Sequence, residues 1–284
     1  MRTTPIIAVL ESAGPRLVPV ETPLLRADDM GLTRGEGAFE TMHVRNNAAW
    51  LLDEHLDRLE RSLSRLHIPA PERSALTELV RVAIAGWGDT EAGVKIIVTK
   101  GAEFGGIGPF VYAVVFPVPE IFTATRRHGV RLASLSWGFP VLARERAPWL
   151  LGGVKSLSYA ANMAALREAA HRGMGDVLLM SADDYVLEAP TASVVWQRGA
   201  SLFTTPTETG ILAGTTAAYL FTNAAEIGLT AGYELISRAE LIAADGAWLC
   251  SSVRGIVPIV EIDASPLPIG SSNAAIQELV GFPM

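Results

Sequence analysis

The sequence predicts a mixed α/β (α+β) protein built in two halves. Short strand-like runs joined by turns fill the first 52 residues and recur after residue 129, and amphipathic helices separate them. A chain of 284 residues can bury roughly 75% of its unfolded surface, which suits one large domain or two modest ones. We expect a smaller N-terminal domain at 1–118, a linker at 119–128 and a larger C-terminal domain at 129–284.

The N-terminal half begins with strands and continues with two helices. Residues 4–52 are typical of strands and turns, and Asn46-Asn47 predicts a hairpin turn. An amphipathic helix is expected over 53–67, with Asp53 as its N-cap. Its apolar residues recur at spacings of three and four: Leu56, Leu59, Leu63 and Leu66. The remaining elements of this half are a helix at 72–86, strands at 93–100 and 110–118, and a glycine-rich loop at 101–108.

The C-terminal half alternates strands with helices. Helices are expected at 157–172, ended by Gly173, and from Thr215 to Ile227. The expected strands cover 130–136, 176–181, 185–199 and 201–206, and the tail contains "ELIAADGAWLCSS" and "IVPIVEID".

Composition and charge exclude several classes of protein. Hydrophobic residues make up 49% and charged residues 19%, as in globular proteins. The net charge of -7 argues against nucleic-acid binding. The longest apolar runs fall far short of the ~20 residues that span a bilayer, so no membrane association is expected. Cys250 is the single cysteine, which fits a reducing, cytoplasmic location.

Zinc-binding, nucleotide-binding and serine-hydrolase signatures are missing from the sequence. The five histidines lack zinc spacing, so we expect no metal site. The sequence contains no P-loop, no nucleophile elbow and no dinucleotide-binding glycine motif. The glycine-rich run "GAEFGGIG" could wrap an anion or form a simple hairpin loop.

Lys155 is the first candidate for chemistry. It lies in "GGVKSLSYAANMAALREA" (152–169), where almost every neighbour is small or apolar. A lysine held out of water loses its charge and can then attack a carbonyl carbon. The alternative is a solvated lysine near the start of a helix.

Other residues favour the reactive lysine. Tyr159 follows by four residues, which would place both side chains on one helix face. Glu188 ends a strand, and Thr215 and Thr216 stand at an expected helix N-terminus, a site that favours phosphate. The run "CSSVRG" (250–255) adds hydroxyls, and Arg58 could bind phosphate or pair with Glu54 in the same helix. A lysine, a carboxylate, a tyrosine and a phosphate cradle together suit pyridoxal 5'-phosphate.

Six motifs in order resemble the class IV pyridoxal-phosphate enzymes, which include branched-chain and D-amino acid aminotransferases and aminodeoxychorismate lyases. The resemblance runs from 28–44 to 250–259. The motifs are "GEGAFET", "HLDRLERS", "KSLSYAANMAALREA", "LEAPTASVVW", "ILAGTTAAYL" and "CSSVRGIVPI". The resemblance implies a fold type IV architecture like that of D-amino acid aminotransferase, in two domains, and a homodimer.

The resemblance also implies which residues bind the cofactor. Lys155 would carry it covalently, Tyr159 would lie near its phenolic oxygen, and Glu188 would meet its ring nitrogen. Its phosphate would be bound by Arg58, Thr215, Thr216 and Ser252.

The chain departs from the family pattern in ways that concern the substrate. Ser193 replaces a usual asparagine, and "GVKI" (93–96) stands where branched-chain enzymes carry tyrosine–x–arginine. Candidate cations for substrate carboxylates are Lys100, Arg254 and Arg45.

We therefore interpret the chain as a lyase that converts 4-amino-4-deoxychorismate to 4-aminobenzoate and pyruvate, a step of folate biosynthesis. The run "SSVRG" favours this choice by resemblance. The alternatives are an aminotransferase for branched-chain or D-amino acids, and a non-catalytic binding protein in which Lys155 is structural. The expected partner is a small-molecule amino substrate.

Overall fold

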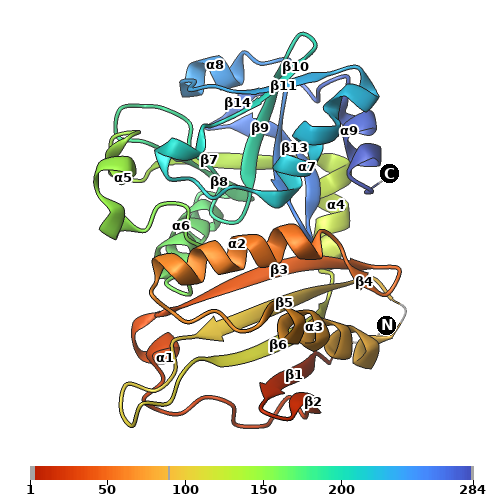
Figure 1. Ribbon diagram of the computed structural model, residues 1–284. Coiled ribbons are helices and arrows are strands. Elements are labelled where there is room, and N and C mark those ends of the chain that lie inside the picture. The colour runs from red at the N-terminus through yellow and green to blue at the C-terminus, as the bar shows by residue number, and fades with distance from the viewer. Residues whose placement is uncertain (1–3, 89, 283–284) are drawn as a thin grey trace. The chain divides into compact units, whose positions relative to one another are not determined.

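The computed structural model describes residues 4–88 and 90–282 and divides into two compact units. The first unit comprises Met1–Val118 with Val154–Tyr159, and the second comprises Pro119–Gly153 with Ala160–Met284. Each unit contains one sheet and its own helices, so the predicted mixed α/β class is confirmed (Figure 1). The domain limits expected from the sequence stay a prediction. Within them, the expected linker forms a helix of the second unit, and the segment around Lys155 groups with the first.

The sheet of the first unit has six antiparallel strands. They are β1 (Ile6–Glu11), β2 (Gly14–Val18), β3 (Gly37–Arg45), β4 (Ala48–Ala49), β5 (Ala92–Thr99) and β6 (Phe110–Pro117), in the spatial order β2-β1-β6-β5-β3-β4. The predicted turn joins β3 to β4. Asn46 and Asn47 both have positive φ, 50° and 56°, as a two-residue hairpin turn of this kind requires.

Helices α2 (Leu52–Arg65) and α3 (Arg73–Trp87) pack on this sheet, and α1 (Met30–Arg34) precedes β3 (Figure 1). The predicted leucine stripe of α2 is buried, and each such side chain stabilises the fold by about 1.5–3 kcal/mol. The expected N-cap at Asp53 is wrong. The N-cap is Leu51, because this residue adopts a left-handed conformation at φ 57° and starts the helix earlier, which places Asp53 in the first turn.

The sheet of the second unit is mixed. Its strands are β7 (Val130–Ser136), β8 (Asp176–Met180), β9 (Ser193–Arg198), β10 (Ser201–Thr204), β11 (Thr230–Tyr233), β12 (Gly246–Ser251), β13 (Gly255–Ile262) and β14 (Ser265–Pro266). The order is β11-β10-β9-β12-β13-β7-β8, with β14 beside β13. The pairs β10–β11, β7–β13 and β7–β8 are parallel. Trp196 and Trp248 are fully buried in this unit.

Two helices of the second unit match predicted helices with shifted limits, α6 (Ala160–His171) and α7 (Thr215–Asn223). Four further helices were not predicted: α4 (Glu120–His128), α5 (Ala143–Arg146), α8 (Arg238–Ile242) and α9 (Asn273–Leu279). Short 3-10 turns η1 (Pro148–Leu150), η2 (Thr207–Thr209) and η3 (Ala224–Ile227) add to them, and η3 takes up the end of the helix expected at 215–227. Gly173, at φ 72°, follows the end of α6 as expected.

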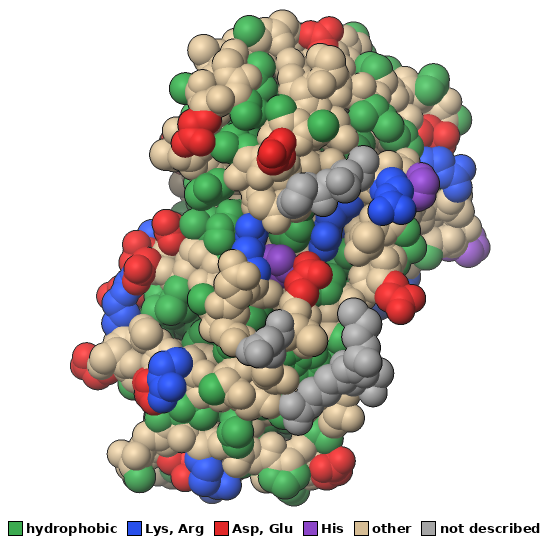
Figure 2. Space-filling view, turned by 90° about the vertical axis from the view of Figure 1, so that its right-hand side faces the viewer, with side chains coloured by type: hydrophobic (Ala, Val, Ile, Leu, Met, Phe, Trp, Pro, Cys, Tyr) green, Lys and Arg blue, Asp and Glu red, His purple; other side chains and the backbone are tan. Residues whose placement is uncertain are grey.

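Surface charge and the length of the apolar helices both bear on possible binding partners. Basic and acidic side chains are interspersed on the face drawn in Figure 2. Across 4–88 and 90–282, no helix has both the length and the apolar character needed to cross a bilayer.

Candidate active site

The segment that carries Lys155 pairs with the start of β3. The Phe39 amide donates to the Lys155 carbonyl at 3.1 Å, and the Leu157 amide donates to the Gly37 carbonyl at 2.8 Å. The Lys155 amide donates to Ser62 Oγ of α2 at 3.2 Å. These hydrogen bonds hold the backbone around the lysine against β3 and α2, with an antiparallel bridge between Ala38 and Ser156.

Two glycines of the "GEGAFET" motif make room for this segment. A Cβ added at Gly37 would lie 2.5 Å from Leu157 Cδ1 and 2.6 Å from the Val98 carbonyl oxygen. A Cβ at Gly35, which has φ 70°, would lie 2.4 Å from Ser158 Oγ. The motif therefore has a packing reason, since any larger residue would push the lysine segment away from β3.

The expected helix face shared by Lys155 and Tyr159 is wrong. Helix α6 begins only at Ala160, because the preceding residues pair with β3. The two side chains still meet, next to the Phe39 ring. Lys155 Nζ lies 4.5 Å from the Phe39 ring centroid and 5.9 Å from that of Tyr159, and the two rings pack edge to face at 5.3 Å. The half-buried amine thus has an aromatic environment.

Arg58 belongs to a buried charge cluster with Glu40 and His55. Its Nε and one Nη each donate to a different Glu40 oxygen at 2.7 Å, and His55 Nδ1 lies 2.6 Å from Glu40 Oε2. Glu40 and His55 are completely buried, and Arg58 is nearly so. Arg58 pairs here with Glu40 and not with Glu54. A guanidinium has five N–H donors, so this bidentate pair is compatible with a further anion.

The cluster shifts the pKa values of Glu40 and His55. Burial alone would raise the pKa of Glu40, but the charge and hydrogen bonds of Arg58, aided by His55, outweigh it and lower the pKa to about 2. Burial lowers the pKa of His55 against the pull of Glu40, and the positive charges of Arg58 and Lys155 lower it further. Glu40 therefore stays ionised and holds Arg58 in one orientation. The sequence signal for Glu40 was its place in the "GEGAFET" motif.

Lys95 is a site candidate that sequence reasoning missed. Its Nζ lies 5.4 Å from the Phe39 centroid and 6.0 Å from that of Phe116. Partial burial lowers its pKa. Lys95 and Lys155 are thus both cationic neighbours of the Phe39 ring. The available signal was a single charged residue within an otherwise uncharged strand, "AGVKIIVT".

The second unit contains the predicted carboxylate and phosphate-binding residues. One Glu188 oxygen accepts a hydrogen bond from the Leu212 amide at 3.1 Å, in the loop that leads to α7. Gly214 is the N-cap of α7 and contributes no side-chain cap. A Cβ at Gly214 would lie 2.2 Å from Ser193 Oγ, so Ser193 packs closely on this turn.

Three hydroxyls converge at the N-terminus of α7. Thr215 Oγ1 and Thr216 Oγ1 each lie 3.5 Å from Ser252 Oγ, and both threonines are buried. The first-turn N–H groups of a helix and its dipole favour an anion at this end. The structure thus brings together three of the predicted phosphate ligands, while Arg58 lies in the other unit.

Each of the three residues predicted to bind a substrate carboxylate already interacts with another residue of the protein. Lys100 pairs with Glu36 at 2.7 Å, and Arg254 pairs with buried Asp176 at 2.5 Å. The Arg45 guanidinium lies over the Trp50 ring at 4.2 Å. A substrate carboxylate would have to compete with the first two of these ion pairs.

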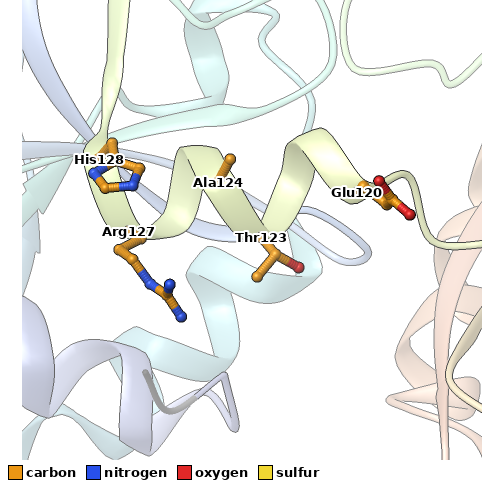
Figure 3. A pocket seen from close by; sticks show the side chains of 5 residues that line it. All are labelled: Glu120, Thr123, Ala124, Arg127 and His128. Atoms are coloured by element: carbon orange, nitrogen blue, oxygen red, sulfur yellow. The ribbon is translucent and has the colours of Figure 1, made fainter.

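A pocket of about 410 Å³ lies elsewhere, along α4. It is lined by Glu120, Thr123, Ala124, Arg127 and His128, whose side chains Figure 3 shows, and it contains none of the predicted site residues. Across the described ranges, no group of three or more His, Cys, Asp or Glu side chains is arranged to hold a metal ion.

The donor groups fit a phosphorylated pyridine aldehyde. The hydroxyls and amides at α7 suit its phosphate, and Glu188, anchored by the Leu212 amide, suits a protonated ring nitrogen. Lys155 offers the amine for a covalent bond with the aldehyde carbon.

Comparison with known proteins agrees with these motifs. The amino-transferase class IV family model matches residues 37–262. A bifunctional aminodeoxychorismate lyase / D-amino acid transaminase from Mycobacterium tuberculosis is 38% identical over 268 residues, which cover 91% of this chain and 92% of the relative.

Two solved structures share the whole fold. The PLP-bound form of a hypothetical aminotransferase from Mycobacterium tuberculosis has a TM-score of 0.92 at 36% identity and covers 98% of this chain and 97% of its own. A fold IV-transaminase from Curtobacterium pusillum has a TM-score of 0.91 at 36% identity, with 98% and 99% covered. These likenesses confirm the predicted fold type IV. The chain belongs to the class IV aminotransferase family and depends on pyridoxal phosphate.

Proposed function

We propose that this class IV enzyme is an aminodeoxychorismate lyase, which cleaves 4-amino-4-deoxychorismate into 4-aminobenzoate and pyruvate. The observation that carries the proposal is the 38% identity, over nine-tenths of the chain, to a relative named for this lyase activity. That relative is named for D-amino acid transamination as well. D-amino acid transamination is therefore the second candidate activity.

Each predicted site residue would have a separate role in this reaction. Lys155 would hold the cofactor through its amine, and the same amine would take the proton from the substrate carbon that bears the nitrogen. Glu188 would stay ionised and hold the proton of the ring nitrogen. Thr215, Thr216, Ser252 and Arg58 would bind the phosphate, and Tyr159 would orient the ring. When bound, pyridoxal phosphate supplies an electron-withdrawing ring that stabilises negative charge on the reacting carbon.

Glu40 contributes by holding Arg58. A buried guanidinium that is fixed at two N–H groups loses little further entropy when it binds an anion. We propose that Gly35 and Gly37 likewise position the segment that carries Lys155, because their lack of a side chain lets that segment pack on β3.

The lyase substrate carries two carboxylates, and Lys95 is our first choice for one of them. Its ammonium group borders the same Phe39 ring as the Lys155 amine. Lys100, Arg254 and Arg45 remain predictions for the other carboxylate. We further propose that the enzyme works as a homodimer in the cytoplasm.

Product analysis separates the two activities. The purified holoenzyme is incubated with 4-amino-4-deoxychorismate, and in parallel with D-alanine and 2-oxoglutarate. The lyase predicts 4-aminobenzoate and pyruvate in equal amounts with no amino acceptor present. Pyruvate formed only when 2-oxoglutarate is present, with no 4-aminobenzoate from the first mixture, would leave transamination as the function.

A further inference from the structure

Arg144 of α5 lies between two backbone segments that lead to the active-site residues of the second unit and to Lys155. Its Nη1 donates to the Gly210 carbonyl at 2.8 Å, and its guanidinium lies 5.7 Å from the Trp137 ring centroid. The same Gly210 carbonyl accepts from the Gly153 amide at 2.9 Å. One carbonyl oxygen therefore joins the arginine to both segments.

The arginine stem fills space that two glycines leave open. A Cβ at Gly210 would lie 2.5 Å from Arg144 Cδ and 2.6 Å from its Cβ. A Cβ at Gly152 would lie 3.0 Å from Arg144 Cβ and 2.9 Å from the Gly210 Cα. Gly210 also has φ 81°, a conformation that favours glycine. The two glycines and the stem thus pack as one layer, in which no side chain larger than hydrogen fits at either glycine.

Each segment leads directly to residues that the cofactor needs. Gly153 is the last residue before the segment 154–159, and Lys155 follows two positions later. Beyond Gly210, Leu212 donates its amide to Glu188, and Gly214 opens helix α7. A shift of the Gly210 carbonyl would therefore displace both the segment that leads to Lys155 and the loop whose Leu212 amide holds Glu188.

Charge supports the same arrangement. Burial lowers the pKa of Arg144, and the nearby Glu188 carboxylate opposes that shift.

We propose that Arg144 is a positioning residue that clamps Gly152–Gly153 to the Gly210–Gly214 loop. The clamp does not depend on the function proposed above, whereas its expected effect on cofactor binding rests on that function.

Hydrogen exchange on the apoenzyme and holoenzyme tests the clamp. Arg144→Met keeps most of the stem but removes the donor and the charge. Loss of a charged hydrogen bond predicts at least about tenfold faster exchange at the Gly153 and Leu212 amides, with β9 and β12 unchanged. The matched control is Arg146→Met, an exposed arginine of the same helix, which should exchange like the parent. Equal exchange in the Arg144 and Arg146 variants would overturn the clamp.

Cofactor affinity gives a second test of the clamp. Arg144→Lys, which keeps a donor, should keep pyridoxal phosphate affinity within about threefold of the parent, whereas Arg144→Met should lose roughly tenfold. Equal affinity in Arg144→Met and the parent would overturn the role of the clamp in cofactor positioning. If Arg144→Met does not fold, Arg144→Leu, which also lacks the donor, carries the exchange test; exchange equal to that of the parent would again overturn the clamp.

Discussion

Replacement of Glu40 by glutamine should strongly destabilise the first unit. The carboxylate is completely buried and accepts two hydrogen bonds from Arg58 and one from His55. A glutamine side chain would leave the Arg58 charge buried without a counter-ion and would turn an N–H group toward it. Breaking one partner of a buried ion pair costs about 3–5 kcal/mol.

The pKa of Glu40 gives the size of this loss of stability independently. A fall from 4.5 to about 2 corresponds to about 3 kcal/mol of folding free energy at neutral pH. Because the folded-state pKa is depressed, this contribution is complete above pH 4.5 and is lost as the pH falls toward 2. The stability difference between parent and Glu40→Gln should therefore narrow by about 1 kcal/mol between pH 6 and pH 4.

Urea unfolding of four variants provides the assay. Glu40→Gln and Arg58→Met should each lose about 3–5 kcal/mol, but the double variant should lose roughly 2–3 kcal/mol less than their sum, because it leaves no unpaired charge. The control is Glu60→Gln, which changes an exposed carboxylate of α2, the helix that carries Arg58. Its free energy of unfolding should stay within about 0.5 kcal/mol of the parent. Strict additivity, or a difference that stays constant from pH 6 to pH 4, would refute the buried ion pair.

Three further substitutions probe the site. Gly37→Ala should lower the free energy of unfolding in urea by about 1–3 kcal/mol, because the new Cβ meets the Val98 carbonyl. Gly108→Ala is the control, since the space around Gly108 is open, and its stability should change little. Equal stabilities of the two variants would contradict the packing reason for the motif. Lys95→Met should raise KM for aminodeoxychorismate by roughly tenfold or more with a smaller effect on kcat, and exposed Arg81→Met serves as its control. An unchanged KM would remove Lys95 from the substrate site. Glu188→Gln should keep cofactor affinity within about tenfold but lower kcat by about a hundredfold; unchanged turnover would count against its place at the ring nitrogen.

The sequence predicted the fold well where periodicity was strong. The leucine stripe of α2 and the Asn46-Asn47 turn are confirmed, because spacing and positive-φ residues act locally. The start of α6 was predicted too early. Residues 157–159 have helix-forming neighbours, but pairing of this segment with β3, more than a hundred residues away, overrides local preference.

The candidate site was predicted unevenly for a similar reason. Ordered motifs pointed to the family, which the comparisons confirm, and to residues such as Glu188 and Thr215. They did not reveal that Glu40 pairs with Arg58, nor that Arg144 packs between two glycines, since those contacts join distant segments. Lys95 was passed over because an isolated charge in a strand has many explanations until its neighbours are known.

Borohydride reduction of the holoenzyme, followed by peptide mass spectrometry, identifies the amine that carries the cofactor. The chain has three lysines, Lys95, Lys100 and Lys155, so the assignment leaves few alternatives. We expect a pyridoxyl phosphate label on the peptide that contains Lys155 and its loss in Lys155→Ala. A label on Lys95 or Lys100, or none on a protein that has bound the cofactor, would contradict a reactive amine at position 155.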